Sequence, residues 1–259
     1  MKLINILINI FGFIKNGIKE YTGNMNFDKS YIIGIPQLSQ KRLDRCFEKF
    51  KNQNIDVELW EGKYGLEVDL DEYKKKGYLS NDFKLKLPGS LGCLLSHVTL
   101  WEHIYNDSNC EVALICEDDI LLNKDFKVKL DEIPWSDVPE DWDIIKLSYH
   151  GLDGESISNN IIKPSYSTKK GANSGMFCYL IKSSSVPTLK NILLPYNGQG
   201  SQDVTLRENF RNFNPYLLKN RLAIELRYKH SIRKELNFTA KNLSWMEKIY
   251  MKISKKLFS

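Results

Sequence analysis

The feature that most limits how this 259-residue chain can fold is a short apolar run that leads directly into three acids. Val112–Cys116 has the length and composition of a buried strand, and Glu117, Asp118 and Asp119 follow it without a break. Charged side chains are costly inside a core, so the strand must end at an edge where they meet water or a partner. The run therefore predicts a buried strand that ends at a polar site.

The rest of the chain alternates between apolar runs of strand length and segments with helical spacing. Further strands are expected at 31–35, 55–60, 143–148 and 176–181, and helices around 43–50, 94–105, 186–194 and 203–210. The stretches 61–89 and 150–172 are expected to be loops, the first with one short helix. This alternation predicts a single α/β domain with a mostly parallel, Rossmann-like central sheet, in which ligands bind at the carboxyl ends of the strands.

The three acids have the chemistry of a site for a divalent cation. Alternate residues of a strand face opposite sides, so Glu117 and Asp119 are expected to share one side and Asp118 the other. Carboxylates held close together raise one another's pKa unless a cation offsets them. Mg²⁺ and Mn²⁺ prefer such oxygen ligands, and an ion there could stabilise a diphosphate leaving group. The alternative is a solvated acidic turn.

The charge and the cysteines exclude several classes of protein. The net charge is +5; residues 241–259 carry +4 and residues 1–25 carry +2, which leaves −1 for the middle of the chain. A nucleic-acid-binding domain would hold the basic excess itself, so no nucleic-acid partner is expected. Five cysteines without a CxxC pair indicate buried, reduced thiols in a reducing compartment and argue against a structural zinc site.

Both ends of the chain have amphipathic patterns. Apolar residues fill much of 1–25, and the basic segment 241–259 sets Trp245 and Ile249 against Lys248 and Lys252. Helices of this composition lie on anionic membrane surfaces. The alternative is that both segments pack on the protein itself. The expected organisation is thus a catalytic or binding domain at 26–240 between two amphipathic segments.

Three stretches form one pattern: Pro88–His97 with its Gly-Cys-x-Leu-Ser-His sequence, Trp101-Glu102, and Ala113–Asp119. Together they resemble glycosyltransferase family 25, which includes bacterial lipooligosaccharide galactosyltransferases and collagen galactosyltransferase domains. Weaker matches extend the resemblance over about 30–235. Ser90 stands where the family usually has Glu, and Gly34 where it prefers Asn.

The resemblance implies a GT-A-like fold, a UDP-sugar donor, Mn²⁺ or Mg²⁺, and transfer of a hexose with inversion. Carried over by position, Glu117 and Asp119 become metal ligands, and the donor-binding residues become Arg42, Ser96, His97 and Asp118. A late histidine is a further metal ligand in many such enzymes, which by analogy points to His230.

Inverting transfer needs a base that removes the proton of the acceptor hydroxyl. Asp203 is the candidate, because it matches a late Asp motif of the family and opens an expected helix, whose dipole keeps a carboxylate ionised. The alternative is that Asp203 only caps that helix.

The first functional hypothesis is a galactosyl- or glucosyltransferase that extends a lipooligosaccharide or other surface glycan at the cytoplasmic face of the bacterial inner membrane. The second is a catalytically lapsed relative that acts as a membrane-surface binding or adhesion protein, which the departures at Ser90 and Gly34 keep open. A metal-dependent phosphoesterase is disfavoured, because only one acid cluster is evident.

Overall fold

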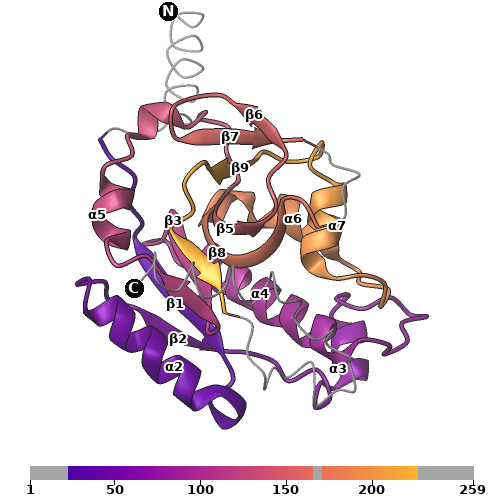
Figure 1. Ribbon diagram of the computed structural model, residues 1–259. Coiled ribbons are helices and arrows are strands. Elements are labelled where there is room, and N and C mark those ends of the chain that lie inside the picture. Colours follow the sequence, from indigo (N-terminus) through magenta and orange to yellow (C-terminus); the bar gives the residue numbers. More distant parts are fainter. Residues whose placement is uncertain (1–22, 166–170, 227–259) are drawn as a thin grey trace, which may run out of the picture.

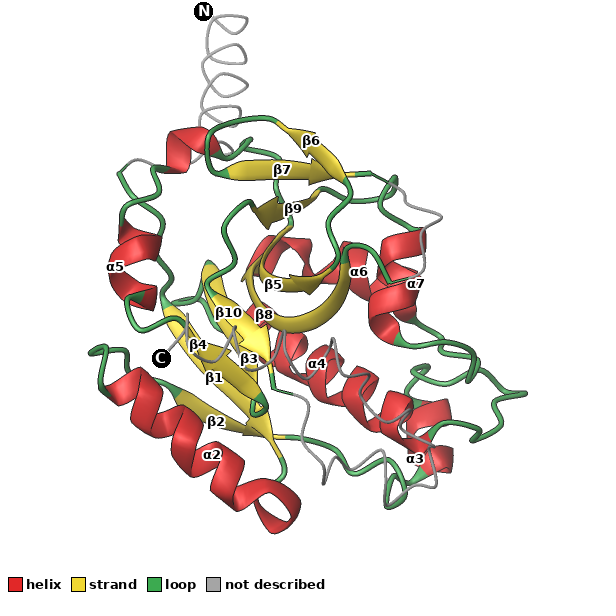
Figure 2. Ribbon diagram, viewed as in Figure 1, coloured by secondary structure: helices red, strands yellow, loops and turns green. Residues whose placement is uncertain are grey.

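The computed structural model describes residues 23–165 and 171–226, which surround one large sheet (Figures 1 and 2). Its strands are β1 (Lys29–Gly34), β2 (Glu58–Glu61), β3 (Val112–Glu117), β5 (Ile144–His150), β6 (Gly154–Ser156), β7 (Ile161–Pro164), β8 (Ser174–Lys182) and β9 (Pro215–Leu218). A separate two-stranded ribbon joins β4 (Ile120–Leu122) to β10 (Ala223–Glu225). The helices are α2 (Pro36–Lys51), α3 (Leu70–Lys75), α4 (Pro88–Asn106), α5 (Phe126–Asp131), α6 (Val186–Leu193) and α7 (Gln202–Glu208).

The strand order of the large sheet is β2-β1-β3-β8-β5-β9-β7-β6. The pairs of β1 with β2, β1 with β3 and β5 with β9 are parallel, and the other four pairs are antiparallel. It follows that six strands run in the direction of β1, and only β8 and β7 run against it. The predicted α/β fold with a mostly parallel central sheet is confirmed.

The alternation of side chains along β3 divides the core into two layers. Leu114 and Cys116 lie in a layer with apolar residues of α2 and α5, whereas Ala113 and Ile115 lie in a layer with residues of α4 and α6. Figure 1 shows α2 and α4 as the long helices beside this part of the sheet. A strand covered on both faces must be apolar throughout, which is why 112–116 reads as an unbroken apolar run.

Two parts of the chain are more ordered than the sequence predicts. The stretch 150–172 contains the antiparallel hairpin of β6 and β7, although it was expected to be loop. The helix expected at 94–105 begins earlier, at Pro88, whose ring suits the first turn of a helix. The hairpin was missed because β6 is exposed and polar, and so lacks the apolar pattern from which strands are predicted.

The two terminal segments lie largely outside the described residues, and so does His230. The predicted boundaries at 25 and 241 and the proposed amphipathic helices stay predictions. Within the residues that the structure describes, no helix has the length and apolar character needed to span a membrane.

Candidate functional site

Glu117 and Asp118, at the end of β3, turn toward different parts of the fold. Glu117 continues the side of β3 that carries Ala113 and Ile115, and its carboxylate contacts His97 of α4. Asp118 continues the opposite side and pairs with Arg42 of α2. The structure thus shows Glu117 and Asp118 on opposite faces, as predicted, while a shared side for Glu117 and Asp119 stays a prediction. The opposite faces follow from the alternation along an extended strand that is packed on both faces.

Asp118 and Arg42 form an ion pair where β3 meets α2. The Arg42 Nη2 atom lies 3.2 Å from Asp118 Oδ2, and both side chains are largely buried. Burial raises the pKa of Asp118, while the Arg42 charge opposes that rise. Two of the four residues predicted to bind the donor are thus joined by an ion pair at the carboxyl end of β1. Direct contact with a nucleotide stays a prediction.

Asp119 lies in surroundings that disfavour its charged form. Burial raises its pKa well above the usual range, and the neighbouring charges of Glu117, Glu225 and Asp118 raise it further. Its Oδ1 atom is buried without a hydrogen-bond partner among the described residues. A buried acceptor without a donor is costly and needs a reason. A bound cation would provide both the missing partner and the offsetting charge.

Glu225 joins this cluster from the last described strand. The ribbon pairs Glu225 with Ile120, directly after the acids, and the Leu226 amide donates to the Asp119 carbonyl. His150 Nε2 lies 3.1 Å from Glu225 Oε2. Sequence reasoning missed both residues, because Glu225 has no motif and only the return of β10 to β4 brings it to the site.

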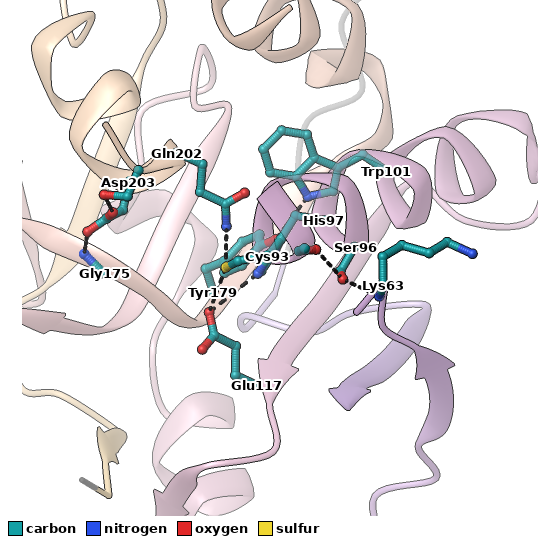
Figure 3. A network of polar contacts seen from close by, with 12 residues as sticks. Lys63, Cys93, Ser96, His97, Trp101, Glu117, Gly175, Tyr179, Gln202 and Asp203 are labelled. Carbon is teal, nitrogen blue, oxygen red and sulfur yellow. Dashed lines mark hydrogen bonds and ion pairs between the residues drawn. The ribbon is translucent and has the colours of Figure 1, made fainter. Parts of the chain in front are cut away.

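Two side chains of α4, the buried His97 and the half-buried Cys93, contact Glu117 (Figure 3). His97 Nε2 lies 3.4 Å from Glu117 Oε1, and Cys93 Sγ lies 4.0 Å from the same oxygen. His97 is completely buried, and this burial lowers its pKa to about 3, although the charge of Asp203 opposes the shift. His97 is therefore neutral at physiological pH.

Ser96 and His97, two of the predicted donor-binding residues, are buried and bonded inside the protein, and their contact with a donor stays a prediction. Ser96 is buried, and its hydroxyl accepts from the Lys63 amide at 2.7 Å and donates to the Gly92 carbonyl at 2.6 Å. Both ring nitrogens of His97 are engaged inside the protein. Both side chains point inward because α4 packs directly against the sheet, and both hold together parts of the chain around the site.

Asp203 lies in the first turn of α7 and is held from two sides. Its Oδ2 accepts the Gly175 amide hydrogen at 2.9 Å, and its Oδ1 accepts from the Ser201 hydroxyl. Burial alone would raise the pKa of Asp203, but these bonds and the nearby Lys146 charge lower it overall. The carboxylate is therefore ionised at neutral pH, as a base must be. Its use as the base stays a prediction.

Lys146 is a buried cation in the middle of β5. Its side chain is 2% exposed, and its ammonium donates to the Asn173 carbonyl at 2.8 Å. Burial lowers the pKa of Lys146 to about 8, while the Asp203 charge acts in the opposite direction. Lys146 thus supplies the countercharge for Asp203, a role that an isolated lysine in a strand does not reveal from sequence.

Comparison with families of known proteins identifies the chain. Residues 27–193 match the family described as "Glycosyltransferase family 25 (LPS biosynthesis protein)". Over 140 residues the chain is 28% identical to procollagen galactosyltransferase 2 of Mus musculus, covering 50% of this chain and 22% of that protein. A glycosyltransferase 25 family member of Aedes aegypti is 27% identical over 141 residues, covering 49% of this chain and 23% of that protein. The chain therefore spans about a fifth of the length of these relatives.

Among solved structures, the apo form of the glycosyltransferase GlyE from Streptococcus pneumoniae aligns with 90% of this chain and 65% of its own, at a TM-score of 0.45 and 9% identity. That likeness is too distant to assign any residue. The family match covers well over half of the chain and includes both the Gly-Cys-x-Leu-Ser-His pattern and the three acids. On this evidence the chain belongs to glycosyltransferase family 25.

Proposed function

We propose that this chain is a metal-dependent glycosyltransferase that moves a hexose from a UDP-sugar to a surface-glycan acceptor with inversion at the anomeric carbon. Galactose is the preferred sugar, because the relatives in animals are named as galactosyltransferases. A lipooligosaccharide or related glycan is the preferred acceptor, because the family is described by lipopolysaccharide biosynthesis. The expected place is the cytoplasmic face of the inner membrane, contacted through both terminal segments.

The observation that carries the proposal is the unbalanced negative charge around Asp119. Burial and the charges of Glu117, Glu225 and Asp118 all raise the pKa of Asp119, and among the described residues the charge of Arg42 acts against them. Asp119 also holds a buried oxygen without a partner among the described residues. Oxygen ligands of this kind suit Mn²⁺ and Mg²⁺. Glu117 and Asp119 would hold such an ion, with Glu225 beside them.

A divalent ion at this place supplies charge stabilisation for the diphosphate of the donor as the sugar leaves. The chain's own residues have separate tasks. The pair of Arg42 and Asp118 borders the site at the end of β1, where a nucleotide would lie in this class of sheet. Asp203 accepts the proton of the acceptor hydroxyl, and the neighbouring Lys146 keeps that carboxylate ionised until the acceptor binds.

Thermal unfolding with UDP and UDP-sugars, in Mn²⁺ or in EDTA, tests this proposal. A ligand at one hundred times its Kd adds about 2.7 kcal/mol to the folded state, which gives a shift of several degrees. We expect a Mn²⁺-dependent shift that is largest with UDP-galactose and absent in Asp119→Ala. Glu155→Ala, at an exposed acid of the far edge strand β6, is the matched control and should behave as wild type.

The contrary result is equally clear. A folded wild-type protein that gains no stability from any of these nucleotides, with or without Mn²⁺, would contradict donor binding. It would favour the second hypothesis, a lapsed relative that binds a membrane surface.

A further inference from the structure

A continuous row of buried polar side chains leads from the interior of the protein to Glu117 (Figure 3). The Trp101 indole donates to the Tyr179 hydroxyl at 2.9 Å, and the Tyr179 hydroxyl lies 2.7 Å from His97 Nδ1. His97 Nε2 in turn lies 3.4 Å from Glu117 Oε1. Trp101, Tyr179 and His97 are each 0% exposed, so water does not interrupt the row.

The hydrogen atoms in this row have one arrangement that satisfies every group. An indole nitrogen can only donate, so the Tyr179 oxygen accepts from Trp101. If His97 also donated to that oxygen, the buried Tyr179 hydrogen would have no acceptor in the row. The hydroxyl therefore donates to Nδ1, which must be unprotonated. In a neutral imidazole the hydrogen is then on Nε2, the atom that faces Glu117.

We propose that His97 is a positioning residue, held as the Nε2–H tautomer by Tyr179 and Trp101, which orients the Glu117 carboxylate for the metal and donor site. The effect of His97 on the metal and donor site rests on the proposed function, whereas its tautomer does not. This indirect role takes the place of the predicted donor contact of His97. Histidine tautomers are commonly set in this way by the hydrogen bond to the other nitrogen.

A second interpretation of the same side chains is a metal site. The ligand atoms of Cys93, His97 and Glu117 all lie within 4.8 Å of one another. His97 could ligate a metal only through an unprotonated Nε2, which requires a hydrogen on Nδ1. That tautomer leaves the Tyr179 hydrogen without an acceptor in the row, so the hydrogen-bond pattern favours the positioning role.

The tautomer can be measured without any activity assay. Long-range ¹H–¹⁵N spectra of protein labelled at its four histidines distinguish the two neutral forms, and loss of one set of signals in a His97 variant assigns His97. We expect the Nε2–H form in the wild type and a mixture of tautomers in Tyr179→Phe. Finding the Nδ1–H form in the wild type would overturn the proposal.

Two His97 variants separate the contact with Glu117 from the contact with Tyr179. The amide nitrogen of His97→Gln reaches the place of Nε2 and can still donate to Glu117. The shorter His97→Asn can accept from Tyr179 but cannot reach Glu117. With similar unfolding midpoints for both, we expect the Mn²⁺ concentration for half-maximal UDP binding to rise about tenfold in His97→Asn and less than threefold in His97→Gln.

An equal rise of this Mn²⁺ concentration in the two variants would contradict the positioning role. If no variant, including the wild type, binds UDP with Mn²⁺, the proposed function fails, and the tautomer measurement still decides whether the row is built as described.

Discussion

At the scale of single residues, three neighbouring acids have three different surroundings. Glu117 is oriented from α4, Asp118 is neutralised by Arg42 of α2, and Asp119 is left with raised pKa among other acids. The differences arise because one strand end separates two packed layers. A bound cation would therefore favour the charged form of Asp119.

Asp203 provides the clearest prediction about a single side chain. Asp203→Asn keeps the shape but removes the charge, so we expect UDP binding to persist within about threefold and sugar transfer to fall by about 10²–10⁴, the usual contribution of a general base. Binding by calorimetry and transfer by product release measure the two effects. Ser201→Ala, which removes only one hydrogen bond to Asp203, is the control and should retain most activity.

A structural role for Asp203 would give a different pattern. If the carboxylate only ties α7 to Gly175, Asp203→Asn should lower the unfolding midpoint and UDP binding together, and the transfer rate of the bound donor would change little.

At the scale of elements, α4 is fixed to the loop before α3 through glycines. A Cβ atom on Gly92 would lie 2.4 Å from the Lys63 carbonyl and 2.9 Å from the Gly65 amide. A Cβ atom on Gly65 would lie 1.8 Å from the Pro88 carbonyl. The Gly-Cys pattern thus has a physical reason, because the backbones of α4 and the loop meet where no side chain fits. The same contact fixes the part of α4 that contains Cys93 and Ser96.

Gly92→Ala should therefore destabilise the fold, although alanine is the better helix former by about 1 kcal/mol. Overpacking costs about 1–3 kcal/mol, and a contact of 2.4 Å with a backbone oxygen belongs at the upper end of that range, so we expect a net loss of roughly 1–2 kcal/mol in urea unfolding. Ser90→Ala, in the same helical turn, is the control and should stay within about 0.5 kcal/mol of wild type. A Gly92→Ala protein as stable as wild type would show that the loop moves away at no cost.

How far the sequence predicts this fold depends on the kind of element. Strands covered on both faces, such as β3 and β8, are apolar along their length and were recognised. The ribbon of β4 and β10 was not, because each strand has only three residues and they are about a hundred positions apart. The same reason hid Glu225 from the predicted site. Local periodicity carries no information on which distant segments pair.

At the scale of the whole molecule, the acids lie at the end of β3, the strand whose two faces pack in the two core layers. Most buried side chains are apolar, but Lys146, His97, Asn173 and Gln202 are buried polar residues, and each has a hydrogen bond to a neighbour. His97, Lys146 and Gln202 lie on α4, β5 and α7, and Asn173 lies directly before β8. Hydrogen-bonded buried polar residues of this kind are expected around a site that must be held rigid.

The central claim, that the acids after β3 hold a divalent ion with the donor, is tested most directly by anomalous diffraction from crystals grown with Mn²⁺ and UDP. The account predicts one manganese peak within bonding distance of Asp119 and Glu117, next to the diphosphate, and its loss in Asp119→Ala. A structure in which UDP is bound and the manganese lies elsewhere, or is absent, would contradict it.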